Sequence, residues 1–480
     1  MPFKSFSREQ DWLLPPSLGD LIPDDHPVRF VAEFVDSLDW DQIGIRNRAE
    51  PYGAPAYAPS LLLAAWLYGF MTRTRSTRQI ERACREHVPM MWLTGLQRPD
   101  HSTLARFYQA NRPALRRLFQ QTVYLAIDTG LVDFALQAVD GTRLAAASPD
   151  SVHTRAEIER LLRAVEHELD DMEAAQTAED NDAAPPPGPR TRVGREQVRA
   201  RLQQALAELE RRAALPGRNK ADAVSRSDPE AALQHTPSGF VTGYNAQAVV
   251  DAKAQIVVAA DVSTCSSDRG HLAPMLAEAH AMTGRHATAV VADKGYFAMS
   301  AICDAQQTGI AVCVPQPAPP RASAGRYTKP DFVYDPDSDT YRCPEGQVLT
   351  FAGVVRSERG KPVDGRTYRG RQCAGCPAKA AGRCTSKPAR VITRYAHDAD
   401  LPAYLEQLRL PLSRQRLRQR KAVVEPLFAN TKQRLGMLRF GLVGWLNAKA
   451  EWWLTCTAYN LLKLWRQWWQ PDHAPAPCAT

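Results

Sequence analysis

The order of apolar segments between residues 131 and 315 constrains the fold of this chain more than any other feature of its sequence. Three stretches typical of strands come first, at 131–148, 239–251 and 254–264. A helical pattern follows at 269–284, and then a strand, a helix and a strand alternate up to residue 315. This order predicts a mixed α/β fold, because a doubly wound parallel sheet would need strict alternation of strands and helices.

Residues 1–130 precede this region and are predicted to form a helical domain. An apolar pattern of helix length begins near Pro59, and the next helix opens with a capping box made by Ser76 and Gln79. Residues 98–127 add one or two amphipathic helices rich in arginine. Such short helices are typical of a packed helical bundle and also of a DNA-binding helix-turn-helix, and the sequence leaves both interpretations open.

Two segments interrupt the predicted α/β domain, which extends over 131–475. Residues 150–225 carry two apolar stripes at helical spacing, separated by a breaker-rich run at 179–190, and this pattern predicts a helical hairpin. Residues 316–400 are rich in Pro, Gly, Arg and Cys and show little periodicity, so we expect something other than a large core to hold them. The chain returns to helix at 402–470, where tryptophans recur at helical spacing among leucines, which favours core packing over base stacking.

Three acidic residues occupy positions from which a catalytic centre could form. Asp140 ends the first strand ahead of Gly141, and Asp293 ends the buried strand that follows the 269–284 helix. Each also has an ordinary interpretation, because Asp-Gly is a turn signal and aspartate often caps a helix. If the two strands are neighbours, however, their aspartates leave the sheet side by side, and a C-terminal helix could bring Glu425 across them.

Three converging carboxylates repel one another unless cations lie between them. Mg²⁺ or Mn²⁺ prefers oxygen ligands, and two such ions can stabilise both the attacking and the leaving oxygen of a phosphoryl transfer. Asp140, Asp293 and Glu425 are therefore predicted to bind a pair of divalent ions. Pro426 follows Glu425 directly and predicts a helix start or a kink at the glutamate, because proline disfavours helical backbone in the residue before it.

Basic residues surround Glu425 with almost no opposing acid, in a chain whose net charge is +8. Arg420, Lys421, Lys432 and Arg434 are the candidates closest to the glutamate. A solvated helix face is the ordinary interpretation of such a run. Beside a metal centre for phosphoryl transfer we favour a surface that binds the phosphates of DNA.

Several segments resemble the DDE transposases of bacterial insertion sequences, in the branch with a helical N-terminal domain and a cysteine-bearing insert. The segments that carry the resemblance are "AVDGT", "SDPEA…TGYNAQAVVD" (227–251), "VVADKGY" (290–296) and "RKAVVEPLFANTKQRLG" (420–436). Further matching segments, "LIPDDHPVRF" (21–30) and "RPDHSTLARF" (98–107), extend it over nearly the whole chain.

The resemblance implies a ribonuclease H-like core that cuts double-stranded DNA at transposon ends and joins the freed 3′ hydroxyls to a target. The resemblance assigns the catalytic triad to Asp140, Asp293 and Glu425. It also implies that Lys432 binds a DNA phosphate near the metal ions. Relatives with a tyrosine and an arginine before the glutamate differ from this chain, which has no tyrosine there, so Arg420 or Lys421 is expected to supply the cation. A homodimer or larger assembly on DNA, near the bacterial nucleoid, is also implied. The alternatives are a related nuclease without strand transfer and a non-catalytic DNA-binding descendant.

The beginning of the chain lacks the pattern of a signal peptide, and no run approaches the length of a membrane span, so we expect a cytoplasmic protein with no membrane partner. Its ten cysteines should then be reduced or bound to metal. Four of them, including one Cys-x-x-Cys pair, fall in the poorly cored segment and suit tetrahedral Zn²⁺, with unligated thiols as the alternative. They are Cys343, Cys373, Cys376 and Cys384.

Overall fold

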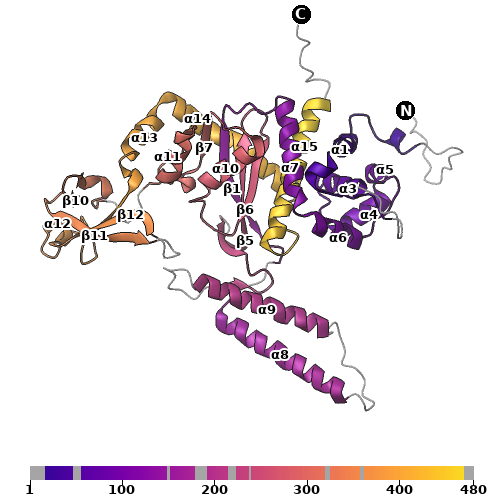
Figure 1. Cartoon of the computed structure of the whole chain (residues 1–480), viewed down its shortest axis with the longest axis horizontal. Helices are drawn as coiled ribbons and strands as arrows, with labels where there is room; N and C mark the ends of the chain where they lie inside the picture. The colour runs from indigo at the N-terminus through magenta and orange to yellow at the C-terminus, as the bar shows by residue number, and fades with distance from the viewer. Residues whose placement is uncertain are drawn as a thin grey trace, which may run out of the picture.

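The computed structural model of the chain describes residues 17–46, 56–148, 152–178, 192–213, 223–236, 239–318, 325–356 and 362–469. A central mixed sheet lies between a group of helices at one end and a second, smaller sheet at the other, and a helical hairpin stands away from all three (Figure 1). The mixed α/β class predicted from the order of apolar segments is confirmed.

Short helices make up most of the described residues before the first strand, as predicted. α3 is apolar on every side because it lies in the middle of this group, against α1, α4, α5 and α6. The predicted capping box is present, since Ser76 Oγ accepts from the Gln79 amide and the Gln79 side chain accepts from the Ser76 amide. The helices are α1 (Pro27–Asp36), α2 (Trp40–Ile43), α3 (Pro59–Met71), α4 (Thr77–Glu86), α5 (Val88–Leu93), α6 (His101–Asn111) and α7 (Ala114–Asp128).

The central sheet has the strand order β4-β5-β1-β7-β8, with β6 also paired to β5. β1 runs antiparallel to β5 and parallel to β7, which is in turn parallel to β8. Parallel neighbours require crossovers, and the helices α10 (Leu272–Thr283) and α11 (Met299–Gln307) occupy the connections before and after β7. The strands are β1 (Gln137–Ala145), β4 (Ala232–Thr236), β5 (Gly239–Asp251), β6 (Val257–Ser263), β7 (Ala289–Ala292) and β8 (Ala311–Cys313).

Helices from the C-terminal part complete the core. α13 (Leu401–Arg409) leads into α14 (Pro411–Ala429), which packs against β1, β5, β7 and β8. α15 (Trp445–Trp469) packs against α3, α7 and β6 and so joins the N-terminal helices to the sheet. Trp452 is fully buried and its indole N–H donates to the Gln247 carbonyl at 2.9 Å, so the core-packing interpretation is confirmed for it.

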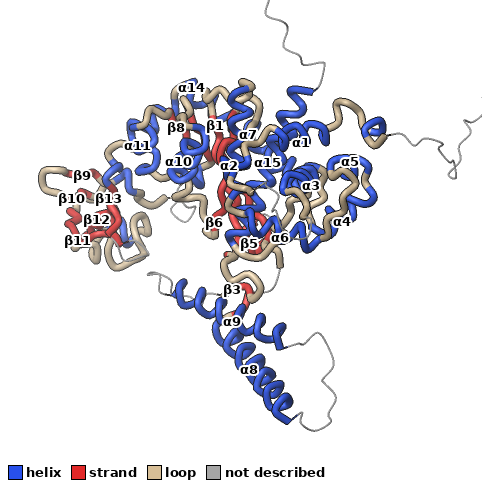
Figure 2. Tube along the Cα trace, turned by 45° about the vertical axis from the view of Figure 1, so that its right-hand side comes forward, coloured by secondary structure: helices blue, strands red, loops and turns tan. Residues whose placement is uncertain are grey.

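The helices α8 (Arg155–Ala178) and α9 (Arg192–Ala213) lie side by side and project from the rest of the molecule (Figure 2). The short pair β2 (Val152–His153) and β3 (Val224–Ser225) joins the two chain segments at the base of the hairpin. Residues 179–191, which include the breaker-rich run, lie outside the described residues. The hairpin has an apolar cluster of its own, formed by Ile158, Val165, Leu169, Leu202, Ala205, Leu209 and Val224.

The cysteine-rich segment forms an antiparallel sheet of its own, in the order β13-β12-β11-β10-β9, with the short helix α12 (Pro377–Ala380). The sequence did not predict these strands, because only a few apolar side chains, Phe332, Tyr341, Leu349, Tyr368 and Ile392, make its buried cluster. The expectation that a large core is absent agrees with this small cluster. The strands are β9 (Val333–Asp335), β10 (Thr340–Arg342), β11 (Val348–Arg356), β12 (Pro362–Gly370) and β13 (Val391–Tyr395).

No helix among the described residues has both the length and the apolar composition needed to cross a membrane.

Candidate active site

Asp140 and Asp293 occupy neighbouring positions of the central sheet. Val139 of β1 and Ala292 of β7 are paired in the parallel ladder of these two strands. Asp140 directly follows Val139, and Asp293 directly follows Ala292. Asp293 also caps the 3₁₀-helix at Lys294–Tyr296, where its Oδ1 accepts from the Lys294 amide at 2.7 Å. The ordinary role of Asp293 as a cap therefore coexists with its position beside Asp140.

The carboxylate of Asp140 is partly buried and held by two donors. Its Oδ1 accepts from the Gly141 amide at 2.8 Å, and its Oδ2 accepts from Nη1 of Arg420 on α14 at 2.7 Å. Burial raises the pKa of Asp140 and the negative charge of Asp293 raises it further, although both donors act to lower it. The two aspartates are thus electrostatically coupled.

Gly141 does not form a turn, although the Asp-Gly pair taken alone indicates one. β1 continues through Gly141 to Ala145, and Gly141 pairs with Gln247 on β5. A Cβ atom at this position would lie 2.3 Å from Nε2 of Gln247, so no larger residue fits without a shift of that side chain. The close approach of the Gln247 side chain favours glycine at position 141. Asp140 lies in the interior of β1 and not, as the sequence predicts, at its end.

Glu425 lies within α14 and is exposed. The prediction of a helix start at Glu425 is wrong, because the helix begins at Pro411 and continues past Pro426 to Ala429. Glu425 follows Arg420 by five residues, which corresponds to about 7.5 Å along the helix axis. Its carboxylate does not join those of Asp140 and Asp293 in a group of metal-ligand spacing among the described residues.

A polar network that the sequence did not single out lies beside Asp140. Asp268 accepts from the side chains of Arg143 at 2.8 Å, Asn245 at 2.8 Å and Gln247 at 3.1 Å. Gln247 also accepts from the buried hydroxyl of Tyr296. The signal in the sequence was the polar pair in "GYNAQAVV", since amide side chains inside an otherwise apolar strand need partners.

The candidate DNA-binding residues differ in their surroundings. Arg420 is paired with Asp140, whereas Lys421 and Arg434 are exposed. Lys432 is half-buried in the π-helical turn at Asn430–Arg434 that continues α14, and burial lowers its pKa. The turn therefore interrupts the regular α-helical spacing between Glu425 and Lys432.

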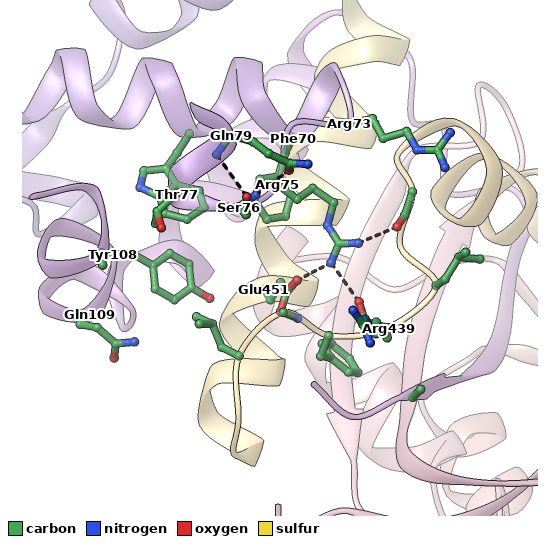
Figure 3. Close-up of a pocket in the computed structure, with 18 residues that line it drawn as sticks. Phe70, Arg73, Arg75, Ser76, Thr77, Gln79, Tyr108, Gln109, Arg439 and Glu451 are labelled. Carbon is green, nitrogen blue, oxygen red and sulfur yellow. Dashed lines mark hydrogen bonds and ion pairs between the residues drawn. The ribbon is translucent and has the colours of Figure 1, made fainter. Parts of the chain in front are cut away.

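A cavity of about 700 Å³ lies between the N-terminal helices and the loop that follows this π-helical turn (Figure 3). Arg75, in the connection between α3 and α4, donates to the carbonyls of Gly436 at 2.7 Å and Arg439 at 3.1 Å and forms an ion pair with Glu451 on α15. Glu451 is almost fully buried, and its second oxygen accepts from the Gly441 amide at 2.8 Å. The pair joins the N-terminal helices to the chain that leaves α14.

The four cysteines of the second sheet line one small cavity, together with Tyr327 and Phe332. Burial raises the pKa of the Cys384 thiol, and the thiols of Cys373, Cys376 and Cys343 act in the same direction. A Cβ atom on Gly370 would lie 2.7 Å from Sγ of Cys373. The four side chains therefore converge, although no three of their sulfur atoms lie within 4.8 Å of one another.

Cys303, His397 and Asp400 form the one group of three possible metal ligands of that spacing among the described residues. His397 Nδ1 lies 3.1 Å from Oδ2 of Asp400, and the Cys303 thiol donates to the same oxygen at 3.8 Å. These residues come from α11 and from the chain between β13 and α13, so sequence spacing could not reveal them. Hydrogen bonds already account for the arrangement.

Two family models match the chain. The first is described as "Transposase domain (DUF772)" and matches residues 16–110, which hold most of the N-terminal helices. The second is described as "Transposase DDE domain" and matches residues 342–465, which hold Glu425, Lys432 and the four cysteines. Neither match includes Asp140 or Asp293.

No curated protein matches the chain, and no solved structure does. The two matched models both describe transposase domains and cover opposite ends of the chain, and the second includes the motif around Glu425. Together the two matches support the identification of the chain as an insertion-sequence DDE transposase.

Proposed function

We propose that this transposase cleaves DNA strands at the ends of its insertion sequence and transfers the freed 3′ hydroxyls to target DNA, using Asp140, Asp293 and Glu425. The observation that carries the proposal is the adjacency of Asp140 and Asp293 on parallel strands, with the helix that bears Glu425 joined to Asp140 through Arg420. A ribonuclease H-like arrangement of the core is part of the same proposal, supported by the antiparallel β5–β1 pair beside the parallel β1–β7 pair.

The two aspartates fit a divalent-cation site, because side-by-side carboxylates offer hard oxygen ligands and repel each other otherwise. Glu425 would complete the ligand set from α14. A pair of Mg²⁺ or Mn²⁺ ions bound there would stabilise the attacking and leaving oxygens of phosphoryl transfer. Arg420, Lys421, Lys432 and Arg434 are proposed to neutralise DNA phosphates around the same centre.

Two phosphoryl transfers make up the proposed reaction. In the first, a water oxygen attacks a phosphorus at the transposon end, the bond to the 3′ oxygen breaks, and that oxygen takes a proton to become a hydroxyl. In the second, this 3′ hydroxyl loses its proton and attacks a phosphorus of the target, whose own 3′ oxygen leaves and is protonated. A homodimer or larger assembly would hold two ends for paired joining.

The test is incubation of the protein with DNA that carries the ends of the element, a target plasmid and Mg²⁺. Asp140→Asn, Asp293→Asn and Glu425→Gln should each lower both steps by about 100-fold or more, because a neutral isostere keeps the shape and loses the ligand charge. Asp128→Asn and Glu406→Gln, at exposed positions on α7 and α13, are the matched controls and should leave both steps unchanged.

Each outcome of this experiment separates the alternatives. Cleaved ends without joined product would indicate a nuclease that only hydrolyses. Sequence-specific binding without any cleavage, under Mg²⁺ and under Mn²⁺, would indicate a non-catalytic DNA-binding protein. Near-normal cleavage by one of the three variants would remove that residue from the triad.

A structural zinc ion held by Cys343, Cys373, Cys376 and Cys384 is a separate part of the proposal. The four side chains line one cavity in a sheet with a small apolar cluster. A thiolate-bound metal would stabilise such a segment, because metal binding then contributes directly to the free energy of folding.

A further inference from the structure

A proline interrupts the hydrogen bonding of the helix that carries the candidate catalytic glutamate. Pro426 lies inside α14, directly after Glu425. Proline has no amide proton, so the carbonyl four residues earlier, that of Ala422, has no partner from residue 426. Backbone carbonyls of folded proteins are nearly always paired, and a donor from elsewhere is expected.

Gln255 supplies that donor from a distant part of the chain. Its Nε2 lies 2.8 Å from the Ala422 oxygen and donates to it. Gln255 is in the connection between β5 and β6, and its backbone has φ of 60°, in the left-handed region that residues other than glycine seldom adopt. A non-glycine residue in this region costs free energy, and such positions are often maintained for a specific side-chain placement.

Lys463 on α15 fixes the orientation of the Gln255 amide. Its Nζ donates to Oε1 of Gln255 at 2.7 Å, and an ammonium group can only donate. The oxygen of the amide must therefore face Lys463, which leaves the NH₂ group facing Ala422. A continuous connection runs from α15 through Gln255 to the turn of α14 that holds Glu425.

We propose that Gln255 is a positioning residue for Glu425, acting in place of the helical hydrogen bond that Pro426 removes. Ala422 and Glu425 are three residues apart and belong to the same helical turn. The contact from Gln255 holds this turn against the sheet on one side, while Arg420 ties the preceding turn to Asp140. This inference rests on the proposed catalytic role of Glu425.

A double-mutant cycle tests the mechanism, because Pro426→Ala restores the missing amide proton. Gln255→Ala alone should lower the rate of strand cleavage about three- to tenfold and raise the Mg²⁺ concentration needed for half-maximal cleavage, with affinity for transposon ends unchanged. In the Pro426→Ala background the same Gln255→Ala change should have no effect, because the helix then pairs the Ala422 carbonyl itself. Lys253→Ala, at an exposed position of the same connection, is the matched control.

Lys463→Met tests the contact between Gln255 and the Ala422 carbonyl in a second way. It leaves Gln255 in place but frees its amide to rotate, so a smaller loss of cleavage is expected, and this loss should also vanish in the Pro426→Ala background. Equal effects of Gln255→Ala with and without Pro426 would overturn the inference, as would a lowered DNA affinity that accounts for the whole loss. If Glu425→Gln itself cleaves DNA normally, the proposed catalytic role of Glu425 fails first, and that result is distinguishable because it needs no change at Gln255.

Discussion

The guanidinium of Arg420 donates to Oδ2 of Asp140 at 2.7 Å and joins helix α14 to strand β1. The two residues are 280 positions apart in the sequence, and each belongs to a different half of the candidate active site. The contact balances the charge of one carboxylate of an adjacent pair, which would otherwise repel its neighbour. It also fixes where α14, and therefore Glu425, passes over the sheet.

Replacing Arg420 by alanine should shift the pH dependence of cleavage. Burial and Asp293 raise the pKa of Asp140, and Arg420 opposes them, so its loss raises that pKa further. A carboxyl with a higher pKa is protonated over a wider acidic range, and the rate should therefore begin to fall at a higher pH in Arg420→Ala than in the parent. Arg420→Lys should lie between the two. A pH–rate profile at limiting Mg²⁺, where protons compete with the metal for Asp140, measures this, and coincident acidic limbs would contradict it.

Lys432 provides a test of phosphate contact. Lys432→Ala should reduce the slope of log affinity against log salt by about one and should weaken cognate and scrambled ends about equally. Arg201→Ala, an exposed arginine on the projecting helix α9, is the control and should leave the slope unchanged. A change in the preference between the two DNAs would instead show that Lys432 reads sequence.

Elemental analysis of protein purified without chelator should find one zinc ion per chain bound by the four converging cysteines. Cys373→Ser combined with Cys376→Ser should remove it and lower the melting temperature, since the second sheet has only a small apolar cluster. Cys265 is exposed and ungrouped, and Cys265→Ser should retain the metal. Zinc that survives the double replacement would place the ion elsewhere, with Cys303, His397 and Asp400 as the next group to test.

Breaking the ion pair between Arg75 and Glu451 should destabilise the protein strongly. Both side chains are at least 86% buried, so Arg75→Ala leaves an uncompensated charge in the interior, which costs about 3–5 kcal/mol of unfolding free energy. Arg82→Ala breaks an exposed pair with Glu86 and should cost less than about 1 kcal/mol. Denaturant unfolding compares the two variants, and similar losses would show that the Arg75 pair is not specially important.

His26 should make the stability of the N-terminal helices depend on pH. Its Nδ1 accepts from the Val28 amide at 3.2 Å and caps α1, which only the neutral ring can do. Burial lowers the pKa of His26 and the nearby His87 and Arg29 act in the same direction, against Asp25. His26 therefore resists protonation in the folded state. Its contribution to the stability of the fold is complete above the ordinary pKa of about 6.5 and is lost as the pH falls below it.

The replacement His26→Asn isolates this effect from the other histidines, because asparagine is a good N-cap and does not titrate. The variant should show a smaller loss of melting temperature between about pH 7 and pH 5 than the parent. Identical pH profiles for the two proteins would assign the dependence to other groups.

Local patterns were sufficient to predict several features of the fold. The helices before residue 130, the capping box of Ser76, the mixed α/β class and the helical stripes of 150–225 all follow from periodicities of two to four residues. Such periodicities are set by the geometry of a single strand or helix and need no knowledge of the rest of the chain. The cysteine-rich sheet was missed because its strands are short and its few buried apolar positions are widely spaced.

The sequence by itself determined which residues could form the site, since aspartates within or directly after apolar strands and a glutamate in a basic helix can be recognised locally. Only the tertiary structure decided what each of them touches. Arg420 reaches Asp140, Gln255 reaches the carbonyl freed by Pro426, and Arg75 reaches Glu451, across separations of 167 to 376 residues. Each of these bonds satisfies a buried or orphaned polar group, and its partner is chosen by which elements the fold brings within 3 Å, a property of the whole packed chain that no local periodicity contains.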